Sequence, residues 1–470
     1  MDLLVFITFL ILLFLLRHYL LKQLRSTIPH FSQQSVPDAD PIFPLGFNFG
    51  VSTAAYQIEE NCPPSNWKLW EKQYDENGRQ RAPTADEKCQ GYSRFIQDIE
   101  LIQHLDCNFY RFSLLWSRIN PRPGYFDDSV MNIYRANIIK LKESGIEPLL
   151  VLWHFEHPAW LEERGSVMSD EFVSRFGEYV EYVLRNIGSL VNLYNTVNEP
   201  FGFVATALFS GLHPPGKKSL KEMFQAMYNL MQCHANAYHL IRKYNPNAKV
   251  SYAKNIVPFV PVHKWSLIEH IIAYYLNSYS RIGFSIFETG KLRFLWMEKE
   301  FDNIIGTLDY ISLNHYYVAF VSINPKEWSK LNGNTVPFLT YGERFLPTND
   351  MGWGMLPSSL AGITKWLHEK FNKQKNLPVM ITEHGAADKE DTKRQWFTKE
   401  SLLHLSMLAE EVPLMGYTHW TLMDNYEWAE GLDMRFGLYE MDYNTQERKP
   451  RQSVEMFRKI IEVNRNQPDF

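Results

Sequence analysis

The sequence predicts an α/β protein built on a closed (β/α)8 barrel, and three features of the chain support this class. Short apolar runs rich in β-branched residues recur along the chain and alternate with segments of helical periodicity. Several runs are apolar on both faces, as expected for parallel strands that helices cover on the outside. No Gly-rich phosphate-binding loop follows the first run, which disfavours an open doubly wound sheet. We therefore expect one large barrel domain.

Eight apolar runs are expected to form the barrel strands. They cover residues 47–53, 107–116, 147–155, 192–199, 249–255, 308–317, 378–384 and 415–425. The helical spacing between them is clearest in residues 92–105, 129–145, 170–188 and 225–244. Two of these segments end in a glycine, Gly145 or Gly188, as is typical of a helix C-cap.

The first 25 residues differ from the rest of the chain. Leu3 to Leu16 is an unbroken apolar run of 14 residues, followed by several basic residues that begin with Arg17. A spanning helix needs about 20 residues, so this run reaches across a membrane only if the helix continues through Leu21. No basic residue precedes the run and no small-residue cleavage site follows it, which disfavours a cleaved signal peptide.

We therefore expect an N-terminal hydrophobic anchor with a basic flank over residues 1–25, a linker over 26–43 and a barrel domain over 44–470. The basic residues follow the apolar run, which favours a single-pass anchor with the barrel domain on the cytoplasmic side. A cleaved signal peptide and a secreted product are the alternative. The membrane is thus an expected partner of the N-terminal segment.

Composition excludes several classes of function. The net charge is −5 and basic residues do not cluster beyond the N-terminus, so we expect no nucleic-acid partner. An aromatic content of 15% suits a pocket that stacks on flat apolar faces. The four cysteines lack metal-site spacing, and His154, Glu156 and His157 match no zinc-binding pattern. We therefore expect neither a metal nor another cofactor.

Polar side chains recur where the expected strands end. Because the carboxyl ends of barrel strands meet at one mouth, these side chains should converge there. Taken singly, each has a structural explanation: Arg111 could belong to a buried ion pair, His154 could be a core histidine and Asn314 a turn residue. Their shared position on successive strands favours a functional site. In chain order, they are Gln57, Arg111, His154, Glu199, Asn255, Asn314 with Tyr316, Glu383 and Trp420.

Two of these residues are glutamates, on the fourth and seventh expected strands. Glu199 lies near the end of the stretch LYNTVNEP, and Glu383 near the end of PVMITEHG. Two carboxylates about 5–5.5 Å apart can cleave a glycosidic bond with retention of configuration. One attacks the anomeric carbon, while the other donates a proton and later activates water. Neighbouring Arg and Tyr groups would keep the first ionised, whereas an apolar setting would keep the second protonated.

The motifs TVNEP and ITEHG resemble the acid/base and nucleophile motifs of glycoside hydrolase family 1, the β-glucosidase and β-galactosidase family. The resemblance covers nearly everything from Phe43 to about Val463. It implies that Glu199 is the acid/base and Glu383 the nucleophile. It also implies that Arg111 and Tyr316 lie beside the nucleophile.

Further motifs follow in the order found in this family and imply that their residues bind the sugar. They are FGVSTAAYQIEE, YRFSLLWSRI, LWHFEHPAWL, SLNHYY, DMGWGMLPSSL and HWTLMDNYEWAEG. His384 replaces the Asn of the nucleophile motif, and Phe155 stands where a Trp is common, so the departures concern specificity rather than chemistry. The implied substrate-binding residues are Gln57, His154, Asn198, Asn314, Trp353 on the leaving-group side, Trp420, Glu427 and Trp428.

The resemblance implies a retaining β-glycosidase acting on unphosphorylated β-glucosides or β-galactosides, with glycolipid as one candidate substrate. Glu427 disfavours 6-phosphorylated sugars, because relatives that cleave those replace this residue. A membrane-associated transglycosylase, which transfers the glycosyl group to a lipid or sugar hydroxyl, is the alternative, since the same intermediate serves both reactions. A non-catalytic, klotho-like binding protein is a third hypothesis, although such proteins have lost carboxylates that this chain retains. The expected partner is thus a carbohydrate or glycolipid.

Overall fold

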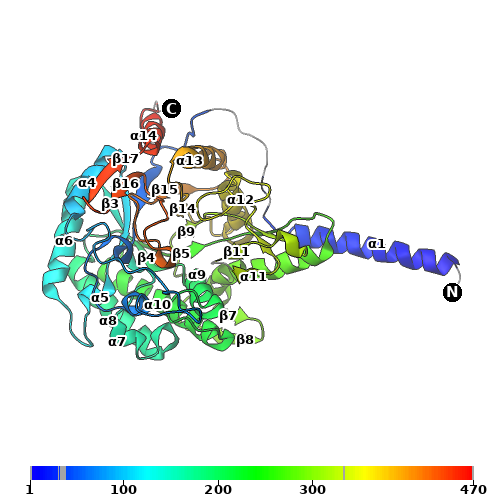
Figure 1. The fold of residues 1–470 in the computed structure, drawn as a ribbon, viewed down its shortest axis with the longest axis horizontal. Helices are drawn as coiled ribbons and strands as arrows, with labels where there is room; N and C mark the ends of the chain where they lie inside the picture. The colour runs from blue at the N-terminus through cyan, green and yellow to red at the C-terminus, as the bar shows by residue number, and fades with distance from the viewer. Residues whose placement is uncertain (1–2, 30, 32–38, 332–333, 468–470) are drawn as a thin grey trace.

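The structure is a computed structural model that describes residues 3–29, 31, 39–331 and 334–467; the side chains of residues 3–11, 331, 334 and 335 are outside this description. Eight parallel strands close into a barrel in the order β1-β15-β14-β9-β5-β4-β3-β2 (Figure 1). Each overlaps one of the eight predicted runs, so the predicted (β/α)8 fold is confirmed. The strands are β1 (Asn48–Ser52), β2 (Phe109–Ser113), β3 (Glu147–Trp153), β4 (Leu193–Asn198), β5 (Lys249–Asn255), β9 (Ile311–Asn314), β14 (Val379–His384) and β15 (Leu414–Trp420).

Helices cover the outside of the barrel (Figure 1). The four helices predicted from periodicity are confirmed as α4 (Phe95–His104), α6 (Asp128–Glu143), α8 (Asp170–Ile187) and α10 (Leu220–Tyr244). Side-chain caps begin three of them: Asp127 accepts from the Val130 N–H at 3.2 Å, Ser169 from the Glu171 N–H at 3.1 Å, and Ser219 from the Glu222 N–H at 3.3 Å. The remaining long helices are α11 (Leu267–Thr289), α12 (Ser358–Leu367), α13 (Thr392–Ser406) and α14 (Gln452–Arg465).

Short elements fill the loops between these strands and helices. The short α-helices are α2 (Ala55–Ile58), α3 (Asn66–Trp70), α5 (Trp116–Ile119), α7 (Ala159–Glu162) and α9 (Pro200–Ala205). One-turn 3₁₀ and π segments are η1 (Ser166–Met168), η2 (Thr206–Ser210), η3 (Pro325–Glu327), η4 (His368–Asn372) and η5 (Trp428–Glu430). A three-stranded sheet joins β6 (Phe259–Pro261), β10 (Ala319–Val321) and β13 (Leu339–Thr340). Three two-stranded sheets pair β7 (Lys291–Phe294) with β8 (Met297–Glu300), β11 (Lys330–Leu331) with β12 (Asn334–Thr335), and β16 (Tyr439–Asp442) with β17 (Glu447–Pro450).

The interior of the barrel is layered, with apolar side chains toward the amino ends of the strands and polar groups toward the mouth. An apolar layer of Phe109, Leu149, Val151, Leu193, Tyr310 and Met380 fills the amino-terminal half of the barrel. Above it, the hydroxyls of Ser312 and Thr382 bond at 2.7 Å, and the Oδ1 atom of Asn195 accepts from the Arg111 Nε–H at 3.3 Å. Because this layer is apolar and offers no charged partner, Arg111 finds its partners toward the carboxyl ends of the strands.

The two glutamates lie where the strand register changes. The pairing of β14 with β9 shifts between Ile381 and Glu383, which brings Glu383 opposite Asn314. Glu199 stands between β4 and α9 with a φ of 40°, in the left-handed region that a side chain with a Cβ seldom adopts. Such backbone strain persists where the surroundings fix a side-chain direction. Both carboxylates therefore leave their strands at the same end of the barrel.

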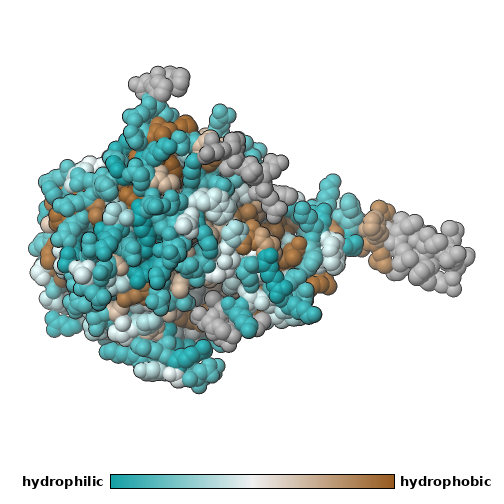
Figure 2. All heavy atoms as spheres, turned by 45° about the horizontal axis from the view of Figure 1, so that its top comes forward, coloured by the Kyte–Doolittle hydropathy of each residue, from teal (hydrophilic) through white to brown (hydrophobic). Residues whose placement is uncertain are grey.

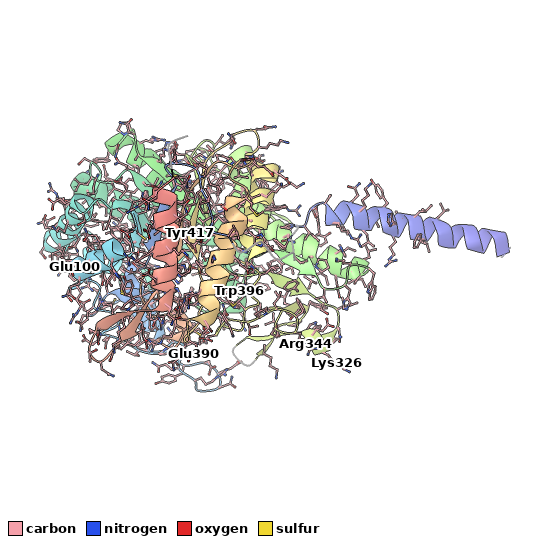
Figure 3. All side chains as sticks on the ribbon, turned by 90° about the horizontal axis from the view of Figure 1, so that it is seen from above. Glu100, Lys326, Arg344, Glu390, Trp396 and Tyr417 are labelled. Carbon is pink, nitrogen blue, oxygen red and sulfur yellow. The ribbon has the colours of Figure 1, made fainter. Side chains whose placement is uncertain are left out.

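Helix α1 (Leu3–Arg25) continues past Leu21 and projects from the body in two perpendicular views (Figures 1 and 3). Within the part of the chain that the structure describes, no helix is long and apolar enough to cross a membrane. From Leu12 on, α1 carries Arg17, Lys22 and Arg25, so its described side chains are too few and too basic to span. The predicted single-pass anchor, and its orientation with it, is therefore not supported. The side chains of residues 3–11, and residues 30 and 32–38 of the predicted linker, lie outside the described residues.

Candidate active site

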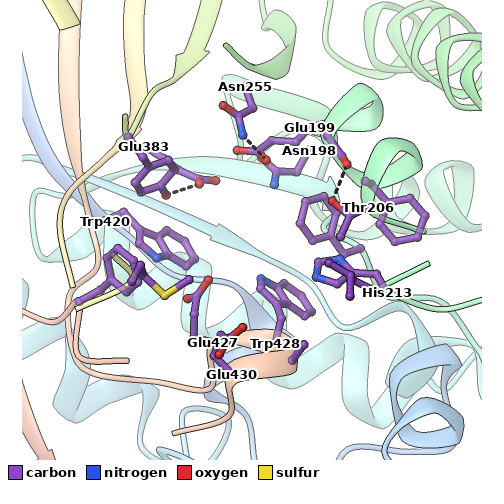
Figure 4. Close-up of a pocket in the computed structure, with 18 of the residues that line it drawn as sticks. Asn198, Glu199, Thr206, His213, Asn255, Glu383, Trp420, Glu427, Trp428 and Glu430 are labelled. Carbon is purple, nitrogen blue, oxygen red and sulfur yellow. Dashed lines mark hydrogen bonds between the residues drawn. The ribbon is translucent and has the colours of Figure 1, made fainter. Parts of the chain in front are cut away.

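A pocket of about 260 Å³ opens at the carboxyl ends of the barrel strands (Figure 4). Most of the predicted site residues line it: His154, Asn198, Glu199, Tyr316, Trp353, Glu383, Trp420, Glu427 and Trp428. Gln57, Arg111 and Asn314 are fully buried behind this wall and contact the lining residues. Figure 4 shows Glu199 and Glu383 on one side of the pocket, with Glu427 and Glu430 facing them across it.

Glu383 is held by two strong donors. The Arg111 Nη1–H donates to its Oε1 atom at 2.6 Å, and the Tyr316 hydroxyl donates to its Oε2 atom at 2.6 Å. Burial and the charge of Glu383 raise the pKa of Tyr316 well above its ordinary value, so this phenol stays protonated and donates. The guanidinium is fully buried, and such a charge-assisted pair stabilises the carboxylate form of Glu383.

Glu199 is held by neutral amides instead. The Asn314 amide donates to its Oε1 atom at 2.7 Å, and the Asn255 amide donates to its Oε2 atom at 3.2 Å. Burial and then the negative charge of Glu383 raise the pKa of Glu199 to about 8. These amides and Arg111 oppose the shift without cancelling it. Glu199 can therefore hold a proton at neutral pH.

Asn198 joins the two carboxylates to His154. Its Oδ1 atom accepts from Arg111 Nη2–H at 2.7 Å and from the Asn314 amide at 3.2 Å, which fixes its own amide nitrogen toward His154. That nitrogen lies 3.0 Å from His154 Nε2. Burial and the Arg111 charge lower the pKa of His154 well below its ordinary value, so the imidazole is neutral and Nε2 accepts. Nδ1 consequently carries the hydrogen, and within the part of the chain that the structure describes this buried atom has no hydrogen-bond partner.

Gln57 and Glu427 form a second polar pair on the opposite wall. The Gln57 Nε2–H donates to the Tyr426 carbonyl at 2.8 Å and approaches Glu427 Oε2 at 3.3 Å. Burial, followed by the charge of Glu383, raises the pKa of Glu427 to about 8. The Gln57 Oε1 atom has no hydrogen-bond partner among the described residues. Free buried polar atoms such as this one and His154 Nδ1 are suited to pair with hydroxyls of a bound molecule.

Aromatic rings complete the pocket. His154 stacks with both Trp420 and Trp428, and each indole centroid is 6.0 Å from the imidazole. Trp353 stacks on Tyr317 at 4.6 Å. Flat apolar faces beside hydroxyl-binding groups suit a sugar ring, whose two faces carry C–H bonds.

Several lining residues were not assigned to the site from the sequence. Asn255 was noted only as a strand end, and its contact with Glu199 follows from that position. Glu430 follows Glu427 by three residues and could have been found from that motif. Met351 lies in the motif DMGWGMLPSSL beside Trp353, whereas Thr206, His213, Tyr341 and Phe436 carry no sequence signal.

The residues that depart from the family pattern divide into two groups. Phe155 lines the pocket and packs 5.2 Å from Trp428. His384 faces away from it, with its Nδ1 atom 3.0 Å from the Tyr417 hydroxyl and its ring 4.9 Å from Phe397. His157 also faces away from the pocket, and its Nε2 atom lies 2.8 Å from Glu162.

A parallel barrel whose mouth holds two buried carboxylates with unlike partners is the arrangement of a glycoside hydrolase. The family model described as Glycosyl hydrolase family 1 matches residues 39–466, and the chain belongs to this family. β-Glucosidase A of Thermotoga maritima is 30% identical over 451 residues, which cover 90% of this chain and 98% of that protein. This relationship extends over the whole barrel.

Solved structures give the same relationship. The β-glucosidase from Thermotoga maritima in complex with deoxynojirimycin has a TM-score of 0.80 at 28% identity, over 90% of this chain and 99% of that chain. The β-glycosidase from Pyrococcus horikoshii has a TM-score of 0.79 at 29% identity, over 90% of this chain and 95% of that chain. The chain is a glycoside hydrolase related to β-glucosidases.

Proposed function

We propose that the protein hydrolyses unphosphorylated β-glucosides or β-galactosides by a two-step retaining mechanism. The unlike environments of Glu199 and Glu383 on one pocket are the observation that carries this proposal. Retention needs one carboxylate that attacks and one carboxylic acid that donates. Glu383 is bound by a guanidinium, and Glu199 has its pKa raised to about 8.

In the first step, an oxygen of Glu383 forms a bond to the anomeric carbon as the bond from that carbon to the glycosidic oxygen breaks. Glu199 transfers its proton to the departing oxygen, so the aglycone leaves as a neutral alcohol. Arg111 loses part of its charge pairing as Glu383 becomes an ester, while the Glu199 carboxylate appears nearby.

In the second step, the Glu199 carboxylate takes a proton from water as the water oxygen attacks the anomeric carbon. The bond to Glu383 breaks, and the carboxylate returns to Arg111 and Tyr316. Two inversions leave the sugar with its original configuration. Gln57, His154 and Glu427 are suited to bind the sugar hydroxyls, since each has a polar atom at or beside the pocket.

Mechanism-based labelling tests this assignment. A 2-deoxy-2-fluoro β-glucoside with a good leaving group should label the enzyme once, and peptide mass spectrometry should place the sugar on Glu383. Proton NMR of the ordinary reaction should show the β-anomer first. Release of the α-anomer first, or a label on another residue, would overturn the proposal.

The charge of the pocket supports a substrate without phosphate. Glu427 and Glu430 both line it, and its described lining residues include no Lys or Arg. A dianionic phosphate would find no cation there to balance its charge. Comparable kcat/KM values on a glucoside and its 6-phosphate would contradict this part of the proposal.

Transglycosylation, to a lipid or sugar hydroxyl, is a second candidate because the outer wall of the pocket is aromatic. Tyr317, Tyr341, Trp353 and Phe436 lie on this wall and could hold an acceptor while excluding water. Product analysis with a glycolipid or a sugar acceptor separates the two reactions. A new glycosylated acceptor at the expense of free sugar indicates transfer, and free sugar alone indicates hydrolysis.

A further inference from the structure

A surface unrelated to the pocket exposes large apolar side chains in a regular pattern. Trp265 precedes α11, and Ile268, Ile271 and Tyr275 follow it on that helix at spacings of three and four residues. They are 63%, 58%, 39% and 68% exposed, respectively. Residues so spaced share one helix face, which in a globular protein is normally the buried one. We define these four residues as the α11 stripe.

Helix α1 runs beside the start of this stripe. The Arg17 guanidinium donates to the Trp265 carbonyl, and that of Arg25 donates to the Lys264 carbonyl. Leu21 is buried, and Ile28 packs in a cluster with Ala273 of α11. These contacts fix the described part of α1 to α11. In the space-filling view, hydrophobic side chains gather on α1 and where it leaves the body (Figure 2).

Residues 12–16 of α1 are exposed and apolar on all sides of the helix. Residues 12–16 are consecutive Leu and Phe side chains, each between 45% and 62% exposed. Five consecutive residues point around the whole helix circumference, because a turn takes about 3.6 residues. A protein groove covers one stripe of a helix, whereas lipid surrounds it. The pattern therefore suits acyl chains better than a protein partner.

The basic residues near the α11 stripe indicate an anionic lipid. The whole chain has a net charge of −5, yet residues 12–28 contain Arg17, Lys22 and Arg25 and no Asp or Glu. Lys264 adds an exposed cation at the start of α11. Basic groups beside an apolar helix, with Trp and Tyr at its edge, are typical of binding to the interface of an anionic bilayer.

We propose that the α11 stripe and the neighbouring basic part of α1 form a docking surface for a bilayer that contains anionic lipid. In this arrangement the stripe lies in the headgroup region, and Arg17, Lys22 and Lys264 contact lipid phosphates. The proposal concerns the peripheral contact of α11 and requires no span by α1. It is also independent of the glycosidase chemistry.

A polarity-sensitive fluorophore can report this contact at a single position. The native cysteines Cys62, Cys89, Cys107 and Cys233 are all buried, so a new surface cysteine would be labelled selectively. We would place the probe at Ile268→Cys in the full chain. The matched control is Trp296→Cys on the β7–β8 hairpin, which is 81% exposed and lies beyond the other end of α11.

Vesicles of phosphatidylcholine with phosphatidylglycerol should shift the emission of the Ile268→Cys probe to shorter wavelength and leave the Trp296→Cys probe unchanged. Vesicles of phosphatidylcholine alone should give a much smaller shift. Added salt should reduce the shift that the anionic vesicles cause. No shift at position 268, equal shifts at both positions, or equal shifts with both lipids would overturn the proposal. A shift that grows with protein concentration without vesicles would identify a second copy of the chain as the occupant instead.

Full-length Trp265→Ala/Ile268→Ser/Tyr275→Ser should bind the anionic vesicles roughly tenfold or more weakly, because it exposes less apolar area to the interface. Its activity on a soluble aryl glucoside should equal that of the wild type, since no residue of the stripe lines the pocket. Wild-type vesicle affinity in this variant would contradict the proposal.

Discussion

Glu383 on β14 and Glu199 at the end of β4 face one pocket from strands that β9 and β5 separate, but their partners differ in kind. Glu383 accepts from a guanidinium and a phenol at 2.6 Å each. Glu199 accepts from two amides at 2.7 and 3.2 Å. A cation favours a carboxylate more strongly than a neutral amide does, so identical side chains become suited to opposite tasks. Their neighbours, rather than the glutamates themselves, define the chemistry.

Removing the attacking group should have the largest effect. Glu383→Gln keeps the size of the side chain but cannot form the glycosyl ester, so kcat should fall by roughly 10⁴-fold or more. Azide should restore turnover of an activated glucoside to Glu383→Ala and give the inverted glycosyl azide. Near-normal turnover in either variant would refute the role of Glu383.

Removing the proton donor should have a smaller effect that depends on the substrate. Glu199→Ala should lower kcat/KM by roughly 10²–10⁴-fold on substrates with poor leaving groups, which is the usual contribution of general acid catalysis. An aryl glucoside with a good leaving group should lose much less in the first step. Azide should now give a product with retained configuration. Equal losses on both substrates would contradict the assignment of Glu199 as acid.

The phenol on Glu383 should contribute less than either carboxylate. Tyr316→Phe removes a hydrogen bond to a charged group, so kcat/KM should fall by roughly 10- to 100-fold. Tyr317→Phe is the matched control, since Tyr317 lines the same pocket and does not bind Glu383. Steady-state kinetics on one aryl glucoside measures both variants. Similar losses in the two would show that the Tyr316 hydrogen bond has no special role.

The amides on Glu199 should tune the pH dependence. The reaction needs protonated Glu199, so kcat/KM should fall as pH rises through its pKa of about 8. The Asn255 amide lowers this pKa, so Asn255→Ala should move the alkaline limb to higher pH. Thr206→Ala, also on the pocket, should leave the limb in place. A shift to lower pH in Asn255→Ala would contradict the assigned hydrogen bond.

Lys254 should affect stability more than activity. It is buried next to Asn255, with its ammonium 4.6 Å from the Phe201 ring centroid, and burial lowers its pKa to about 7. The unfolded chain binds the proton up to about pH 10, so this group makes the wild type gain stability as pH rises from about 7 to about 10. Lys254→Met should remove that dependence and stabilise the protein by roughly 1–3 kcal/mol at pH 6.

Urea unfolding at pH 6 and pH 9 measures this effect. Lys221 on α10 is exposed and provides the control. Lys221→Met should have the same free energy of unfolding as the wild type at both pH values. A Lys254→Met variant that is less stable than the wild type at pH 6 would show that the buried ammonium is needed for folding.

The sequence revealed the barrel and most of its mouth because both have local signatures. Buried parallel strands are short apolar runs, and polar residues such as Arg111, Glu199 and Glu383 stand out where those runs stop. The structure places these residues at one pocket, while their catalytic roles stay predictions.

Other features depend on contacts between distant parts of the chain. Helix α11 was not predicted from the sequence, because apolar residues lie on most of its sides. Gly283 within α11 allows Lys254 to approach closely, since a Cβ at position 283 would lie 2.8 Å from the Lys254 side chain. His213 and Met351 reach the pocket from loops, where position follows from tertiary packing rather than from periodicity. The predicted anchor is not supported, because no helix among the described residues is long and apolar enough to cross a membrane.

The most direct test of the account is the ionisation of Glu199 itself. Carboxyl ¹³C NMR of the glutamate-labelled protein, with the signal assigned by its loss in Glu199→Gln, would follow the titration. The account predicts a pKa of about 8 in the wild type and a lower pKa in Glu383→Gln, because that variant removes the neighbouring negative charge. An ordinary carboxyl pKa for Glu199 in the wild type, or no fall in Glu383→Gln, would contradict it.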